Sequence, residues 1–266
     1  MQKMTAIWLL GGFFCVQAEP AYAADNEATG KALTSAVTVK VSPDLKESMS
    51  LDLGNGVKMD LVLIRPGAFM MGDKDAKPVH KVVLMKPFYM GKFEVTQEQW
   101  QAVMGDNPSN FKDGADAGKR PVEKVSWEDI NAKFLPKLAE RIAKGLIPRL
   151  PTEAEWEYSC RAGTTGDYAG ELDEMGWHNR NSGKTTHPVG QKKPNAWGLY
   201  DMHGNVWEWC SDWYGDYPAN DVTDPAGASS GKFRAYRGGA WFYIDGGCRS
   251  AFRGWISPET RMYNIG

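Results

Sequence analysis

Hydrophobic and polar positions predict strands soon after residue 47. The runs MDLVLIRPGAFMMGD (59–73) and HKVVLMKPFYMGKFEVT (80–96) are rich in β-branched and aromatic residues, and Pro66-Gly67 and Lys86-Pro87 interrupt them. Runs of this kind, broken by Pro and Gly, are typical of strands that meet at turns. We therefore expect β-strands on both sides of each interruption.

Three later segments carry the start and stop signals of helices. Each begins at a Ser or Thr, with an acidic residue or Gln in the first turn, and each ends at a Gly: residues 96–105, 126–145 and 152–163. Pro136 should kink or divide the second helix. From residue 164 onward the chain is dominated by Gly, Pro, Asn and aromatic residues and shows no helical period.

The N-terminus has the pattern of an export signal. Lys3 precedes the apolar run AIWLLGGFFCV, and Ala21-Tyr22-Ala23 supplies the small residues of a cleavage site. We expect residues 1–23 to be removed, residues 24–47 to be a linker and residues 48–266 to be the folded domain. The run is too short for a transmembrane segment, so the product is predicted to be periplasmic, secreted or surface-attached. A lipid on Cys15 is the alternative, which the bulky Phe13-Phe14 pair disfavours.

Composition narrows the class of protein. The chain has 11 Trp, 29 Gly and 15 Pro in 266 residues, which suits a loop-rich fold whose rings fill gaps between turns. A net charge of -2 provides no field for a polynucleotide, so no nucleic-acid partner is expected. Export would leave Cys160, Cys210 and Cys248 in an oxidising compartment, where one disulfide and one free thiol are expected. The sequence does not show which two would pair.

Three blocks resemble the signature blocks of the sulfatase-modifying-factor family, whose founding member is the formylglycine-generating enzyme. They are LPTEAEWEYSCRAGT (150–164), HPVGQKKPNAWGLYDMHGNVWEWCSDWY (187–214) and YRGGAWFYIDGGCRSAFR (236–253). Weaker matches in the same order extend the resemblance over residues 55–266. It implies an α+β fold: a single irregular domain like that of the formylglycine-generating enzyme, related to C-type lectins, with little regular secondary structure.

The resemblance also implies a structural calcium ion in the segment GLYDMHGNVWEW. The matching oxygens would be the side chains of Asp201 and Glu208 and the main-chain carbonyls of Gly204 and Val206. Ca²⁺ prefers six to eight hard oxygen ligands, which a short turn can present together. The alternative is that both carboxylates are ordinary turn and surface residues.

The chain departs from the family at its catalytic residues. The family's oxidases hold copper(I) between two cysteines spaced C-x4-C, and two soft thiolates suit copper(I). In RGGAWFYIDGGC the second cysteine falls on Cys248, but the first falls on Tyr243, and the turn serine is Ala240. Copper is therefore not expected, and no residue is assigned as catalytic. Cys248 would be one only in an oxidative enzyme of altered chemistry.

Other catalytic patterns are missing from the sequence. His80, His178, His187 and His203 form neither an H-x3-H nor an H-E-x-x-H pattern, so a histidine metal centre is not expected. The sequence contains no G-x-S-x-G, phosphate loop or dinucleotide fingerprint.

The C-terminal segment resembles the variable segment of proteins displayed by diversity-generating retroelements. The segment begins with Arg237-Gly238-Gly239 and Trp241, continues through Cys248-Arg249-Ser250-Ala251 and ends at Ile265-Gly266. Variable positions would lie between these fixed ones, although Trp255 is not reachable from an asparagine codon by adenine changes. The alternative is an ordinary non-catalytic paralogue that binds through the same loops.

Both alternatives place a binding surface on the same side chains, because large rings contribute contact area at little entropy cost. The candidate ligand-binding residues are Phe242, Tyr243, Ile244, Asp245, Phe252, Trp255 and Tyr263. The opposing interpretation is that these rings are core, as we expect Trp241 to be. We expect an exported, calcium-stiffened module that binds a protein, peptide or glycan. The alternative function is oxidative maturation of a cysteine or another side chain in a secreted protein or peptide.

Overall fold

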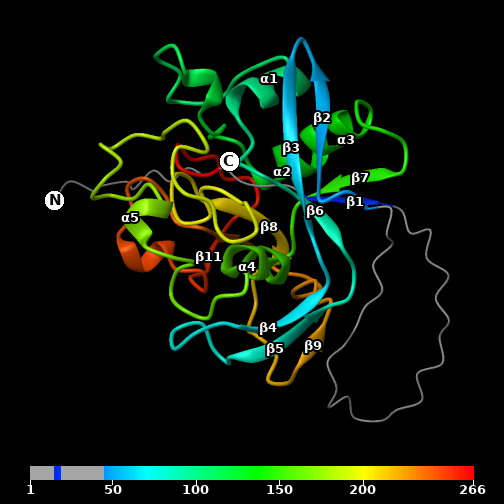
Figure 1. Cartoon of the computed structure of the whole chain (residues 1–266), viewed down its shortest axis with the longest axis vertical. Coiled ribbons are helices and arrows are strands. Elements are labelled where there is room, and N and C mark those ends of the chain that lie inside the picture. The colour runs from blue at the N-terminus through cyan, green and yellow to red at the C-terminus, as the bar shows by residue number, and fades with distance from the viewer. Residues whose placement is uncertain (1–14, 19–44) are drawn as a thin grey trace.

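The strands form three small sheets in residues 15–18 and 45–266, the part of the chain that this computed structural model describes (Figure 1). The first sheet has the order β2-β3-β6-β1-β7, with bounds Ser48–Gly54, Val57–Ile64, Phe88–Gly91, Cys15–Ala18 and Leu146–Arg149. The second has the order β4-β5-β9, with bounds Gly67–Met71, His80–Leu84 and Val222–Thr223. The third has the order β11-β10-β8, with bounds Gly254–Ile256, Arg234–Arg237 and Glu208–Trp213.

The two predicted strand runs are each divided at their proline, as expected. Strand β3 ends at Ile64 and β4 begins at Gly67, while β5 ends at Leu84 and β6 begins at Phe88. β3 pairs antiparallel with β6 in the first sheet, and β4 pairs antiparallel with β5 in the second. Each run therefore crosses from one sheet to another at its turn.

Strand β1 lies inside the predicted signal peptide. Cys15–Ala18 pairs antiparallel with β6 on one side and with β7 on the other, and the Cys15 and Val16 side chains are fully buried. The rest of the predicted leader and most of the predicted linker lie outside the described residues. Cleavage after Ala23 would remove this strand from the first sheet. The mass of the mature protein would show whether the strand is retained.

The helices are short, and their N-termini follow the sequence signals. Capping boxes form at Thr96, Ser126 and Thr152, ahead of α1 (Gln97–Met104), α2 (Trp127–Asp129) and α4 (Glu153–Arg161). The remaining helical elements are η1 (Ala117–Lys119), the π-helical turn η2 (Ile130–Phe134), α3 (Leu135–Ala139), α5 (Leu172–Met175) and η3 (Asp245–Cys248).

The second predicted helix is wrong at its C-terminal end. Helical structure stops at Ala139 instead of continuing to Gly145, and the side chains of residues 140–145 are almost all exposed. Ile142 is the one partly buried side chain of this segment, and a segment with so little apolar surface to bury gains little from packing as a helix. Pro136 divides the helix as expected: a proline cannot donate to the preceding turn, and the π-helical turn η2 lies directly ahead of α3.

Two hydrophobic clusters fill the spaces between these elements. The first joins the β2-β3-β6 part of the sheet to α1 and α3 and includes Trp207 and Trp209. The second lies between α4, the second sheet and β8 and includes Trp156. All three indoles are almost completely buried. Large buried indole rings therefore supply much of the hydrophobic packing in the C-terminal half of the chain, which has few long helices.

The cysteine prediction is wrong for this structure. Cys15, Cys160, Cys210 and Cys248 are all free and buried. In the described residues, no helix has both the length and the apolar character that crossing a membrane requires.

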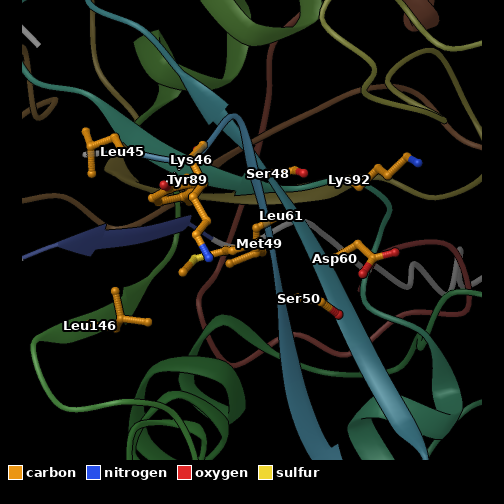
Figure 2. A pocket seen from close by; sticks show the side chains of 10 residues that line it. All are labelled: Leu45, Lys46, Ser48, Met49, Ser50, Asp60, Leu61, Tyr89, Lys92 and Leu146. Carbon is orange, nitrogen blue, oxygen red and sulfur yellow. Dashed lines mark hydrogen bonds between the residues drawn. The ribbon is translucent and has the colours of Figure 1, made fainter. Parts of the chain in front are cut away.

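A pocket of about 760 Å³ lies beside the β2–β3 hairpin (Figure 2). Its side chains come from β2, β3, β6, β7, residues 45–46 and Lys92, which follows β6. The Tyr89 hydroxyl donates to the Lys46 carbonyl at 2.8 Å. None of the candidate ligand-binding or metal-binding residues lines it.

Candidate functional site

The loop between Asp201 and Glu208 has an unusual backbone. Asp201 and Asn205 both have positive φ angles, of 59° and 61°, a region that non-glycine residues rarely adopt. Gly204 has φ 135°, and a Cβ there would lie 2.2 Å from the Trp177 carbonyl oxygen. The loop is therefore tightly curled, and only glycine fits at position 204.

Three carboxylic acids are buried around this loop. Glu94, Asp201 and Glu208 are each at most 1% exposed. Glu94 accepts hydrogen bonds from the Asn205 amide at 2.7 Å and from the Val206 N–H at 3.0 Å. Glu94 is thus hydrogen-bonded to both residues that lie between Gly204 and Trp207 in the loop.

Two carboxylate oxygens in the loop have no hydrogen-bond partner. Asp201 uses Oδ2 to accept from the Gly190 N–H at 2.8 Å, and Glu208 uses Oε2 to accept from the Trp156 indole N–H. Asp201 Oδ1 and Glu208 Oε1 are buried without a partner. A buried, unpaired carboxylate oxygen is costly, which indicates that something compensates it.

The pKa values of these three carboxyl groups are shifted as expected for buried acids without a counter-ion. Burial raises the pKa of Glu94 well above its usual range, and the charges of Asp201 and Glu208 raise it further. Burial likewise raises the pKa of Asp201 to about 7 and that of Glu208 well above its ordinary value. No ion pair to any of these three carboxylates occurs among the described residues.

A calcium ion fits the chemistry of this donor set. The orphaned oxygens of Asp201 and Glu208 are hard, anionic and buried, as Ca²⁺ prefers. Within residues 15–18 and 45–266 no group of three or more His, Cys, Asp or Glu side chains forms a metal site. A cation here would therefore need main-chain oxygens to complete its shell, which is what the predicted carbonyls of Gly204 and Val206 would supply.

The Cys248 loop does not expose a reactive thiol. Cys248 is 0% exposed, and burial raises the pKa of its thiol to about 12, although the Ala240 N–H donates to the sulfur. Tyr243 lies over Gly247, where an added Cβ would be 2.2 Å from the ring, and packs edge-on against Trp207 at 5.0 Å. The site predicted from the family's cysteine pair therefore holds one buried thiol and a packed phenol ring.

Four of the candidate ligand-binding rings are linked by aromatic contacts. Phe242 contacts Tyr243 at 5.6 Å, and Tyr243 contacts Phe252 at 6.1 Å. Tyr263 joins them through Trp241, which contacts both Tyr263 and Phe242. These four rings are half-buried against the first hydrophobic cluster, so each is partly core and partly surface.

The other three candidates are not part of this set of linked ring contacts. Ile244 is 65% exposed, and Asp245, which begins η3, pairs with the Arg180 guanidinium. Trp255 on β11 is 51% exposed and stacks on Tyr214 at 4.7 Å. The structure thus offers a ring cluster with Ile244 beside it in sequence and a separate Trp255 platform.

Two residues contribute to these sites although the sequence analysis did not name them as candidates. Phe111 packs edge-on against Trp241 at 5.5 Å and Tyr263 at 6.3 Å, so a distant loop extends the ring cluster. Glu94 is the other, and its place between Phe93 and Val95 in an apolar run was a signal of a buried carboxyl group. Phe111 carried no such signal, because only the fold brings its loop to Trp241.

A cysteine and a histidine also meet in the interior. Cys160 Sγ lies 3.8 Å from His203 Nε2, a pairing that could suggest a nucleophile and its base. Burial raises the pKa of the Cys160 thiol well above its usual range and lowers that of His203 to about 4. Both shifts favour the neutral form of each group, the thiol of Cys160 and the uncharged ring of His203.

Comparisons with known proteins agree with this fold. The family model described as the sulfatase-modifying factor enzyme 1-like domain matches residues 54–266. The chaperone protein LppX of Paenibacillus barcinonensis is 34% identical over 237 residues, covering 70% of this chain and 79% of that protein. The formylglycine-generating enzyme of Streptomyces coelicolor is 36% identical over 168 residues, covering 55% of this chain and 51% of the enzyme.

A solved structure gives the same result. Treponema denticola variable protein 1 superposes with a TM-score of 0.76 and 33% identity, covering 84% of this chain and 98% of that chain. The predicted α+β fold and the predicted family are confirmed. This chain belongs to the family of the sulfatase-modifying factor enzyme 1-like domain.

Proposed function

We propose that this protein is an exported binding module of the family and not an oxidase. Its binding surface is the ring cluster of Phe242, Tyr243, Phe252 and Tyr263 together with the exposed side chains of Ile244 and Trp255. The likeness to Treponema denticola variable protein 1 over 84% of the chain supports this function. A binding role needs rigid, partly exposed rings, which the half-buried cluster provides.

The observation that carries the proposal is the state of the Cys248 loop. Linear copper(I) needs two thiolates, and the position of the first is Tyr243, whose phenol ring packs against Trp207. The remaining thiol is fully buried, with a pKa of about 12. A neutral, enclosed thiol is a poor metal ligand and a poor nucleophile.

Calcium is the proposed structural cofactor. Asp201 Oδ1 and Glu208 Oε1 are the proposed side-chain ligands, with the carbonyls of Gly204 and Val206 completing part of the shell. The ion would compensate acids that otherwise lie buried without a counter-ion. It would thereby stiffen the loop that ends at Trp207, on which Tyr243 and Phe252 pack.

The source of sequence variation is part of the proposal. A retroelement variable protein would change the residues between the fixed positions of the C-terminal segment, whereas an ordinary paralogue would keep them. The gene's neighbourhood separates the two: a reverse transcriptase gene and a near-copy of the 3′ end of this gene support the first.

An array experiment tests the binding surface. Wild-type protein is applied to peptide and glycan arrays, and every positive feature is repeated with Ile244→Ser and Trp255→Ser. We expect loss of signal for at least one of these two variants. The matched controls are Met70→Ser and Val79→Ser, which replace side chains that are 51% and 47% exposed near the second sheet. Equal loss with the controls, or no loss with either loop variant, contradicts the proposed surface.

A further inference from the structure

A second pocket, of about 330 Å³, lies between α4, the second sheet and the segment 215–228. It is separate from the ring cluster and from the Asp201–Glu208 loop, and none of their residues lines it. Most of its wall is apolar, from the side chains of Met71, Tyr217, Pro218, Val222, Pro225 and Ala226. A cavity of this size with apolar walls and a few polar groups is typical of a small-ligand site.

Asp212 is the polar group that stands out in this wall. It is 4% exposed, and its Oδ2 accepts hydrogen bonds from the Glu153 N–H and the Ser211 hydroxyl, both at 3.0 Å. Gly227 closes over it, with φ 74° and a Cβ position only 2.8 Å from Asp212 Oδ1. The hydrogen bonds of Asp212 are therefore made by Oδ2, while Oδ1 lies toward the loop that borders the pocket.

Asp212 lacks the counter-ion that its neighbour has. Glu153 pairs with Arg237 at 2.8 Å and with Arg253 at 2.6 Å. Among the described residues no salt bridge reaches Asp212. An almost fully buried carboxylate without a paired cation is expensive unless it is protonated or a ligand supplies the charge.

The charges around Asp212 do not replace a counter-ion. Burial raises the pKa of Asp212 to about 7, and the charges of Glu153 and, more weakly, Glu155 raise it further. Arg149 and Arg234 are near enough for Asp212 to raise their pKa values, yet neither forms an ion pair with it. Asp216, which also lines the pocket, is exposed and adds a negative charge at the rim.

Two other polar side chains of the lining, His80 and Arg253, are hydrogen-bonded to groups of the protein itself. His80 Nδ1 is 2.9 Å from the Pro78 carbonyl, which can only accept, so Nδ1 carries a proton and donates to it. The three guanidinium nitrogens of Arg253 donate to both oxygens of Glu153 and to the Gly215 carbonyl. Arg253 is paired with Glu153, whereas Asp212 is buried without a paired cation, so the acceptor that the pocket offers matches a ligand that donates hydrogen bonds and carries a positive charge.

We propose that this pocket binds a primary ammonium group on an alkyl chain, with Asp212 as the charge partner and the apolar wall around the chain. Such a group is found on a lysine side chain of a peptide and on a free alkylamine. A primary ammonium offers three donors and one charge on a thin stem, which fits an unpaired buried carboxylate in a cavity of this volume with mostly apolar walls.

Isothermal titration of the whole purified protein tests the proposal with n-butylammonium chloride as the probe. We expect saturable binding at pH 8 and at least tenfold weaker binding of butan-1-ol, which has the same stem without the charge. Because the carboxyl group must lose its proton, a group with a pKa of about 7 should make binding about tenfold weaker at pH 6. Nα-acetyl-lysine methylamide and 1,4-diaminobutane, run in parallel, show which source of the ammonium group is preferred.

Asp212→Asn keeps the acceptor oxygen and removes the charge, so it should abolish both the preference for the ammonium probe and the pH dependence. Asp216→Asn makes the same chemical change at the exposed rim and should leave the affinity within about twofold. The wild-type comparison of butylammonium with butan-1-ol stands even if Asp212→Asn fails to fold. Equal affinity for the two probes, or an unchanged preference in folded Asp212→Asn, overturns the proposal.

Discussion

Gly239 lies directly against Cys248: a Cβ at position 239 would stand 2.4 Å from the Cys248 sulfur and 2.9 Å from its Cα. The contact seals the thiol on the side of the Arg237-Gly238-Gly239 turn, whose two glycines have φ angles of 99° and 88°. The turn and the buried thiol are therefore one packed unit.

Replacing Gly239 should consequently cost more than an unfavourable φ angle. Gly239→Ala adds backbone strain and a clash with Cys248, and we expect a loss of about 3 kcal/mol or more in the free energy of unfolding. Gly105→Ala is the matched control, because Gly105 has φ 87° and nothing within 4 Å of the added Cβ. Its loss should be about 1 kcal/mol. Equal losses by urea denaturation would show that the Gly239–Cys248 contact has no energetic role.

Arg237 should be among the most sensitive positions in the chain. Its guanidinium is fully buried, pairs with Glu153 and Glu157, and donates to the Ser250 carbonyl at 2.9 Å. Arg237→Met leaves buried acids without their partner, so we expect a loss of about 3–5 kcal/mol. The control, Arg261→Met, breaks a pair with Asp129 whose arginine is 53% exposed, and should cost about 1 kcal/mol or less. Similar losses in chemical denaturation would contradict the structural role of the buried network.

Calcium should stabilise the fold more at pH 8 than at pH 5. Without a cation, burial raises the pKa of Asp201 to about 7, so the folded state holds this proton more tightly than the unfolded chain. That contribution is complete below the unfolded pKa of about 4 and is lost as the pH rises through about 7. Calcium replaces the lost proton as the compensating charge, and its effect therefore grows with pH.

Thermal unfolding with calcium and with a chelator measures this effect. At a concentration a hundredfold above its Kd, calcium should add about 2.7 kcal/mol, or about 5–10 °C in melting temperature for a domain of this size. Asp201→Asn should lose most of the response, whereas Asp113→Asn, at an exposed position, should keep it. A wild-type melting temperature that the chelator leaves unchanged at pH 8 rules out the calcium site.

The sequence predicted the parts of the fold that local chemistry decides. Thr96, Ser126 and Thr152 cap helices because the signal, a hydroxyl three residues before an acceptor side chain, is complete within one turn. The strand breaks at Pro66 and Pro87 were visible for the same reason. The prediction that residues 140–145 are helical is wrong because a glycine marks where a helix can stop. It does not show whether the residues before it can bury an apolar helix face.

Long-range packing decided what the sequence could not show. Tyr243 looked like an exposed recognition residue, yet it also packs on Trp207, which lies 36 positions earlier in the chain. The candidate calcium ligands were named from resemblance. The unpaired oxygens of Asp201 and Glu208, and the hold of Glu94 on the same loop, became visible only in three dimensions.

The mature protein is predicted to begin close to Ala24. Ala21-Tyr22-Ala23 is a suitable cleavage site, and cleavage there would separate β1 from the exported chain. Intact-mass measurement of protein recovered from the cell exterior or periplasm should match a start near residue 24 with three unpaired cysteines. A mass that includes residues 15–18, or a lipid on Cys15, would show that the N-terminal segment is retained.

The central claim, that this chain binds and does not oxidise, is tested most directly by a peptide oxidation assay. Purified protein is incubated with copper(I), oxygen and a Cys-x-Pro-x-Arg peptide, and the peptide mass is followed. We predict that the cysteine stays unmodified with wild-type protein and that Tyr243→Cys, which restores the C-x4-C spacing beside Ala240, is at most feebly active. Conversion of the peptide cysteine to an aldehyde by wild-type protein, lost in Cys248→Ala, would contradict the account and establish an oxidative maturation enzyme.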